Sequence, residues 1–332
     1  MKSSRLFAYL QLMRPANIVT AMADILAGFA VRQAFVVYIF TYMIVGDMKF
    51  VEYMWEQYRF NALLLLVSTI GLYGGGVVYN DVFDAKLDAV ERPERPIPSG
   101  RASFIGAVVL GSILLIGGVL CAFSVSDLSG YIAILTAFFA LLYNKVGKHQ
   151  SWGPINMGLC RGLNLFLGTT LPVRGELGSW GIENPIKSEF LLHFEQYKVL
   201  YICLIPIIYI AAITSVSRGE VHGGSKKSFY IPFFLYSIVI LSIGTLAFIS
   251  GIPIWQSLPF LSLFIYLIFP PLIRAYNDPQ PRNIGLAVKA GVISLIVMDA
   301  SIAAVFAGGI YGLIVLALLP LSRFLAKYFA VT

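Results

Sequence analysis

The sequence predicts an all-α protein that crosses a membrane many times. Of its 332 residues, 58% are hydrophobic and 12% are charged, and the mean hydropathy is +0.81. Soluble domains carry about 25% charged residues, so an ordinary soluble fold is excluded. The apolar residues gather in runs of about 20, the length that a helix needs to cross a bilayer. We therefore expect an integral, multi-pass protein of the lipid bilayer, folded as one domain over residues 1–332.

Ten apolar runs are long enough to be membrane-spanning helices. In chain order they cover residues 17–40, 61–79, 103–123, 129–143, 152–172, 198–216, 229–250, 254–273, 284–306 and 310–326. The fourth run is short, and the last two are separated only by Gly308-Gly309, where the helix is expected to break.

The basic residues predict how the chain is oriented. If the N-terminus faces the cytoplasm, most of the 24 Lys and Arg residues fall in cytoplasmic segments, as the positive-inside rule requires. The protein is then expected in the cell (inner) membrane, with both termini and the polar stretch described next on the cytoplasmic side. The net charge of +7 is attributed to these segments and not to a nucleic-acid partner, because no nucleic-acid motif is found.

The densest polar stretch covers residues 80–101 and is called the first motif. At about 100° per residue on a helix, Asn80, Asp84 and Asp88 turn by only about 40° from one to the next. Asp81 falls beside Asp88. Four oxygen-bearing side chains on one face repel one another unless a cation lies between them, and hard oxygen ligands suit Mg²⁺.

Arginines follow these carboxylates directly, at Arg92, Arg95 and Arg101. Guanidinium groups match phosphate oxygens bidentately, so the first motif predicts a site for Mg²⁺ that carries a phosphate. The alternative is a polar loop that merely solvates a helix connection. Such a loop has no reason to align four oxygen donors on one face or to follow them with the Pro-rich turn at 95–101.

The first motif resembles that of the UbiA-type intramembrane prenyltransferases. It reads N-D-x-x-D-x-x-x-D at Asn80, Asp81, Asp84 and Asp88, followed by R-P-I-P-S-G-R at 95–101. Arg14-Pro15 before the first run and Tyr143-Asn144-Lys145 after the fourth are also similar. The resemblance implies a UbiA-like bundle of nine spans, here with an extra C-terminal helix, and Mg²⁺ ions that bridge the diphosphate of an isoprenoid donor.

By this resemblance, each candidate residue takes a role. Asp84, Asp88 and Tyr143 are catalytic, and Tyr143 faces the carbocation. The metal ligands are Asn80, Asp81, Asp84 and Asp88, and the diphosphate ligands are Arg14, Arg95 and Lys145.

The loop at residues 214–227, called the second motif, departs from the family pattern. The family supplies two or three aspartates there, whereas this chain has Ser217, Glu220 and Gly224 at the aligned positions. Glu220 is the remaining candidate metal ligand, and Arg218 is a candidate diphosphate ligand. A second Mg²⁺ is therefore held weakly by Glu220 and water, or partly replaced by Arg218 and Lys226, or absent because turnover has been lost.

Charged side chains inside a membrane are functional by default, and two of them are predicted to pair. Asp24 lies nine residues beyond Pro15 and Arg161 nine beyond Trp152, so both are expected about 13 Å deep at 1.5 Å per residue. Asn164 shares a helix face with Arg161. The three residues form either an acceptor pocket or a structural ion pair. Asp299 is expected nearer the outer half of its span, with no assigned role.

The resemblance and the charge pattern together predict an enzyme. The expected reaction transfers a prenyl group from a polyprenyl diphosphate to a small acceptor, with Mg²⁺ and an allylic carbocation. The alternative is a non-catalytic isoprenoid-lipid binding or transport protein, favoured only by the reduced second motif. The second motif and Arg161-Gly162-Leu163-Asn164 resemble a divergent, EboC-like branch of the family. The acceptor's chemical class stays open.

Overall fold

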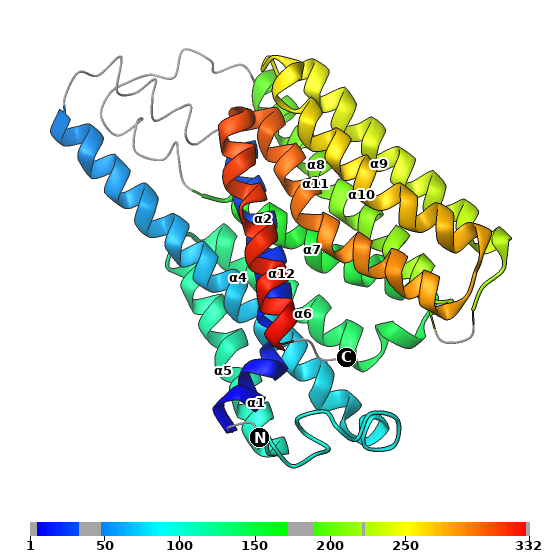
Figure 1. The fold of residues 1–332 in the computed structure, drawn as a ribbon. Coiled ribbons are helices and arrows are strands. Elements are labelled where there is room, and N and C mark those ends of the chain that lie inside the picture. The colour runs from blue at the N-terminus through cyan, green and yellow to red at the C-terminus, as the bar shows by residue number, and fades with distance from the viewer. Residues whose placement is uncertain (1–4, 33–47, 172–188, 221–222, 330–332) are drawn as a thin grey trace.

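The computed structural model describes residues 5–32, 48–171, 189–220 and 223–329, and every element in these ranges is helical (Figure 1). The α-helices are α1 (Arg5–Met13), α2 (Pro15–Val31), α4 (Met48–Glu91), α5 (Phe104–Phe123), α6 (Asp127–Lys145), α7 (Gly153–Thr169), α8 (Glu189–Ser217), α9 (Tyr230–Ile249), α10 (Leu258–Asn277), α11 (Pro281–Leu316) and α12 (Leu318–Phe329). Short 3₁₀ turns are η1 (Gly147–His149), η2 (Lys226–Phe229) and η3 (Ile254–Gln256). The predicted all-α class is confirmed.

Each predicted apolar run falls on a helix, although residues 33–40 and 172 lie outside the described part of the chain. Within the described ranges, seven helical stretches are long and apolar enough to cross a membrane. Helices α2 and α7 have 17 residues each, which is at the lower end of the length that crosses a bilayer. The predicted break at Gly308 is confirmed, because Gly308 has a φ of 84° inside α11. The extra C-terminal helix is the rest of α11 followed by α12.

Helix α4 is the longest element and carries most of the first motif. Its 44 residues extend about 66 Å at 1.5 Å per residue, about twice the thickness of the hydrocarbon core. The C-terminal turns of α4 therefore project beyond the apolar layer. This is why a run of carboxylates can continue the same helix that crosses the membrane.

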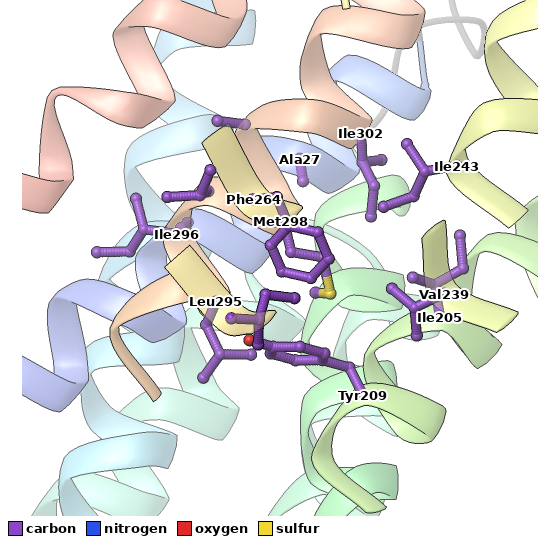
Figure 2. Close-up of a cluster of buried hydrophobic side chains, with 14 of the residues drawn as sticks. Ala27, Ile205, Tyr209, Val239, Ile243, Phe264, Leu295, Ile296, Met298 and Ile302 are labelled. Carbon is purple, nitrogen blue, oxygen red and sulfur yellow. The ribbon is translucent and has the colours of Figure 1, made fainter. Parts of the chain in front are cut away.

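Three hydrophobic clusters lie among the described residues, and α2 contributes to the two larger ones. One core joins α2, α4, α5, α6 and α7 through residues such as Phe29, Leu72 and Leu167. The other joins α2 to α8, α9, α10 and α11, and Figure 2 shows its centre around Tyr209, Phe264 and Met298. Figure 1 shows the two helix groups on either side of α2, α7 and α12.

The first and last helices meet at one end of the bundle. The rings of Phe7 on α1 and Phe329 on α12 stack with their centroids 5.1 Å apart. Nearby, Ser322 Oγ donates to the carbonyl of Ala16 at 3.0 Å. The two ends of the described chain thus lie on the same side, as an even number of crossings predicts.

Candidate active site

One side of the first motif pairs its carboxylates with two arginines. Arg14 donates to Asp81 Oδ1 at 2.6 Å. Arg95 Nη1 lies 2.8 Å from Asp88 Oδ2 and 3.5 Å from Asp81 Oδ1. Asp81, Asp88 and Arg95 are all buried, so each charge depends on its partners. The predicted neighbourhood of Asp81 and Asp88 is confirmed.

Arg14 reaches Asp81 from an unusual backbone conformation. It separates α1 from α2 with a φ of 48°, and Pro15 then begins α2. A residue other than glycine in the left-handed region costs roughly 1–3 kcal/mol and persists where surrounding contacts require it. The ion pair with Asp81 is such a contact. It helps to hold Arg14 in the strained backbone conformation that places its side chain at the site.

The turn after α4 is held by its own hydrogen bonds. Ser99 donates its amide and its hydroxyl to the carbonyl of Arg95, at 3.0 and 2.7 Å. Arg101 donates to the side chain of Gln11 on α1 at 2.8 Å and to the carbonyl of Glu94 at 2.6 Å. These bonds fix the turn against α1 and position Arg95 beneath the carboxylates.

The other side of α4 faces α6 and η1. Asn80 donates its amide nitrogen to Asn144 Oδ1 at 3.1 Å, and Asn144 donates to the carbonyl of Gly76 at 2.7 Å. Asp84 forms an ion pair with Lys148. The four predicted oxygen donors therefore have two sets of partners: Asn80 and Asp84 contact α6 and η1, whereas Asp81 and Asp88 contact the two arginines.

Sequence reasoning chose Lys145 as a diphosphate ligand, whereas the structure brings Lys148 to the carboxylates. Lys145 ends α6 and is exposed. The chain then turns through η1, and this turn carries Lys148 back toward Asp84. The signal for the turn is Gly147, which follows the last helical residues. The role of Lys145 stays a prediction.

The residues of the first motif fit a Mg²⁺ ion that also binds phosphate. Within the described ranges, no three Asp, Glu, His or Cys side chains converge into a cage for a metal. Mg²⁺ does not need such a cage, since one or two carboxylates plus substrate phosphates usually suffice. Asn80, Asp84 and Asp88 follow one another at four-residue spacing on α4, so they present hard oxygen donors along one stripe.

The second motif borders a cavity of about 430 Å³ between α6, η1, α7 and α8. Its polar lining includes Tyr143, Lys148, Ser151, Thr214, Ser217 and Arg218.

Two charged residues of the second motif differ in their surroundings. Arg218 Nη2 donates to the carbonyl of Ser151 at 3.3 Å. Glu220 is exposed, and a Cβ atom built at Gly285 of α11 would meet its Oε1 at 3.4 Å. Partial burial raises the pKa of Glu220, and the charge of Arg92 opposes that rise.

The predicted pair inside the membrane is confirmed as a contact. Arg161 Nη1 donates to Asp24 Oδ2 at 2.8 Å, and Asn164 donates to the same oxygen at 2.9 Å. Arg161 also donates to Thr20 and lies 5.0 Å from the ring centre of Tyr73. The acceptor-pocket role of these residues remains a prediction.

The sequence left Asp299 of α11 without a partner, but the structure brings its buried carboxyl group close enough to Asp24 for the two charges to interact. Neither oxygen of Asp299 accepts a hydrogen bond from a described donor. The buried cluster therefore holds two carboxyl groups and one guanidinium group. No spacing rule along the chain connects α11 to α2, so this contact was not predictable from the sequence.

Comparison with known proteins identifies the family. The UbiA prenyltransferase family matches residues 37–332. The digeranylgeranylglyceryl phosphate synthase of Sulfurisphaera tokodaii is 24% identical over 268 residues, which cover 80% of this chain and 87% of that protein. The synthase of the same name from Methanothrix thermoacetophila is 37% identical over 134 residues, 40% of this chain and 43% of that protein.

Solved structures share the fold. A UbiA homolog from Archaeoglobus fulgidus bound to GPP and Mg²⁺ superposes with a TM-score of 0.60 and 16% identity, over 90% of this chain and 99% of that one. A UbiA homolog from Aeropyrum pernix gives a TM-score of 0.56 at 15% identity, over 83% and 96%. Since the family match spans most of the chain, the protein belongs to the UbiA prenyltransferase family and is a membrane-embedded prenyltransferase.

Proposed function

We propose that the protein transfers a prenyl group from a polyprenyl diphosphate to a small acceptor at the cytoplasmic end of the bundle. The observation that carries this proposal is the first motif, where Asn80, Asp84 and Asp88 form a stripe of oxygen donors on α4. Cationic side chains lie directly beside the stripe, on Lys148 and Arg95. Cations and carboxylates in this order suit a Mg²⁺–diphosphate group.

The proposed reaction breaks one C–O bond and forms another. The bond between the allylic carbon and the diphosphate breaks, and its electron pair leaves with the diphosphate. The allylic cation is then attacked by a nucleophilic atom of the acceptor, which loses its proton. A bound Mg²⁺ ion would neutralise the negative charge that grows on the diphosphate leaving group.

The chain's own residues serve the leaving group and the cation. Lys148 and Arg95 exchange their carboxylate partners for phosphate oxygens when the donor binds, because guanidinium and ammonium groups bind either anion. Tyr143, near Asp84, presents an aromatic face that stabilises a carbocation. Asp81 keeps Arg14 and Arg95 in position. Glu220 contributes to metal binding only through water, since it lies beside Arg92 and α11.

The relatives suggest which acceptor to test first. Their name, digeranylgeranylglyceryl phosphate synthase, describes a product with two geranylgeranyl groups on glyceryl phosphate. An acceptor that already carries one such group would supply a free hydroxyl oxygen as the nucleophile. We propose a hydroxyl-bearing glyceryl phosphate lipid as the acceptor class.

The experiment is a transfer assay with purified protein in liposomes. Radiolabelled geranylgeranyl diphosphate is supplied with geranylgeranylglyceryl phosphate, with an aromatic acceptor or with no acceptor. Labelled lipid with the first acceptor alone supports the proposed acceptor class. Labelled product with the aromatic acceptor alone rejects that class but keeps prenyl transfer. The non-catalytic binder, which the reduced second motif favours, predicts donor binding with no product in any arm.

A further inference from the structure

The cavity beside the second motif is lined by groups that bind anions. Lys148 enters it from η1 and Arg218 from the end of α8. Tyr143, Ser151, Thr214 and Ser217 also line the cavity. The hydroxyls of Thr214 and Ser217 already donate to backbone carbonyls of α8, so the two positive charges are the main anion-binding feature of the lining. Among the described residues that line the cavity, none is a carboxylate, the kind of ligand that a second Mg²⁺ would need.

Arg218 and Lys148 each have one partner among the described residues, a backbone carbonyl for Arg218 and a carboxylate for Lys148. Arg218 donates to a neutral backbone carbonyl, that of Ser151, at 3.3 Å, and the side chain is exposed. Lys148 pairs with Asp84 of the metal stripe and also lines the cavity. Lys148 therefore connects the stripe on α4 to the cavity. A diphosphate matches this arrangement, because one of its phosphate groups can lie at the stripe on α4 while the other lies in the cavity.

Other charged residues of the second motif lie elsewhere. The ammonium group of Lys226 lies 5.6 Å from the centre of the Tyr276 ring. Glu220 faces α11 and interacts with Arg92. Neither of them lines the cavity. The geometry therefore favours direct binding of the diphosphate by Arg218 over a second Mg²⁺ held by Glu220.

We infer that the cavity binds one phosphate group of the donor diphosphate directly, through Lys148 and Arg218, in place of a second Mg²⁺. The inference rests on the proposed function, because it takes the donor to be a prenyl diphosphate. One metal ion, bound at the stripe on α4, then suffices for each donor molecule. The reduced second motif is a functional cationic site and not a relic of lost activity.

The test counts metal ions and measures donor affinity in the purified, full-length protein. The probe is geranyl thiolodiphosphate, an unreactive donor analogue, and Mn²⁺ replaces Mg²⁺ so that bound ions are counted by electron paramagnetic resonance. We expect one tightly bound Mn²⁺ per protein with the probe present. Arg218→Gln should weaken probe binding roughly tenfold to a hundredfold, as loss of a charged hydrogen bond does, and leave the ion count unchanged.

Matched variants separate this result from loss of charge or loss of fold. Lys227→Gln removes one positive charge from the same loop at an exposed position outside the cavity, and should change probe affinity less than twofold. Arg218→Lys should recover part of the affinity. If Arg218→Gln proves unfolded by gel filtration, Lys148→Gln removes the other cation that lines the same cavity, with weaker probe binding expected.

Several results would overturn the inference. Two tightly bound Mn²⁺ ions per wild-type protein, or unchanged probe affinity in Arg218→Gln, would show that the cavity is not the second phosphate site. If Arg218→Gln loses affinity for glycerol phosphate but keeps its affinity for the probe, the cavity binds the acceptor and the inference is also wrong. Wild-type protein that binds no probe and releases no diphosphate would instead refute the proposed function itself.

Discussion

The carboxylates of the first motif that the structure describes each meet a cation. At the end of α4, Asp81 and Asp88 share Arg95, and Asp84 meets Lys148. Breaking a buried pair leaves an uncompensated charge, which costs more than the pair itself contributes. The pairs at the first motif therefore hold its carboxylates and its cations in position.

The cluster inside the membrane makes an asymmetric prediction. Arg161→Met leaves the buried carboxylate of Asp24 without its cation, whereas Asp24→Asn leaves the carboxyl group of Asp299 in the vicinity of Arg161. We expect Arg161→Met to lose roughly 3–5 kcal/mol of unfolding free energy, as broken buried pairs do, and Asp24→Asn to lose less. Unfolding of the purified variants in mixed micelles measures both. A larger loss in Asp24→Asn would contradict the shared-partner arrangement.

At the scale of the elements, α2 and α7 approach closely through two glycines. A Cβ atom on Gly28 would lie 2.4 Å from the carbonyl oxygen of Leu165, and one on Gly168 would lie 2.5 Å from that of Ile25. Small residues allow this backbone contact between membrane helices. The contact sets the distance across which Arg161 of α7 reaches Asp24 of α2.

Substitution of these glycines tests that contact. Gly168→Ala should destabilise the protein by roughly 1–3 kcal/mol, because an added methyl group in a filled space forces the helices apart. The matched control is Gly117→Ala on α5, where nothing lies within 4 Å of the new atom. That control should be neutral or gain up to about 1 kcal/mol from helix propensity. Equal unfolding free energies for the two variants would argue against close packing of α2 on α7.

Sequence reasoning succeeded where a feature depends on local spacing. Helical periodicity placed Asp81 beside Asp88, equal depth in two apolar runs paired Asp24 with Arg161, and a glycine pair located the break at Gly308. It failed where the chain turns or where distant helices meet. The turn η1 brings Lys148 to Asp84, and the packing of α11 on α2 brings Asp299 near Asp24; neither contact was predicted.

At the scale of the whole molecule, orientation in the membrane is the main prediction. The excess of Lys and Arg near the first and second motifs predicts that this end faces the cytoplasm. A cysteine at Ser225, before η2, should then react with a membrane-impermeant maleimide only after cells are permeabilised. A cysteine at Ser124, at the far end of α5, should react in intact cells, with the wild-type protein as background. The reverse pattern would invert the proposed topology.

The proposed prenyl transfer depends on the metal stripe of α4. A Mg²⁺ titration of diphosphate release tests this dependence most directly. Wild-type protein should release diphosphate from geranylgeranyl diphosphate in the presence of acceptor, with saturable dependence on Mg²⁺ and no release in excess chelator. Asp84→Asn should lower the rate at least a hundredfold, as loss of one charge-stabilising group does, while the exposed Asp278→Asn keeps it. Release that persists without Mg²⁺, or undiminished release by Asp84→Asn, would contradict the account.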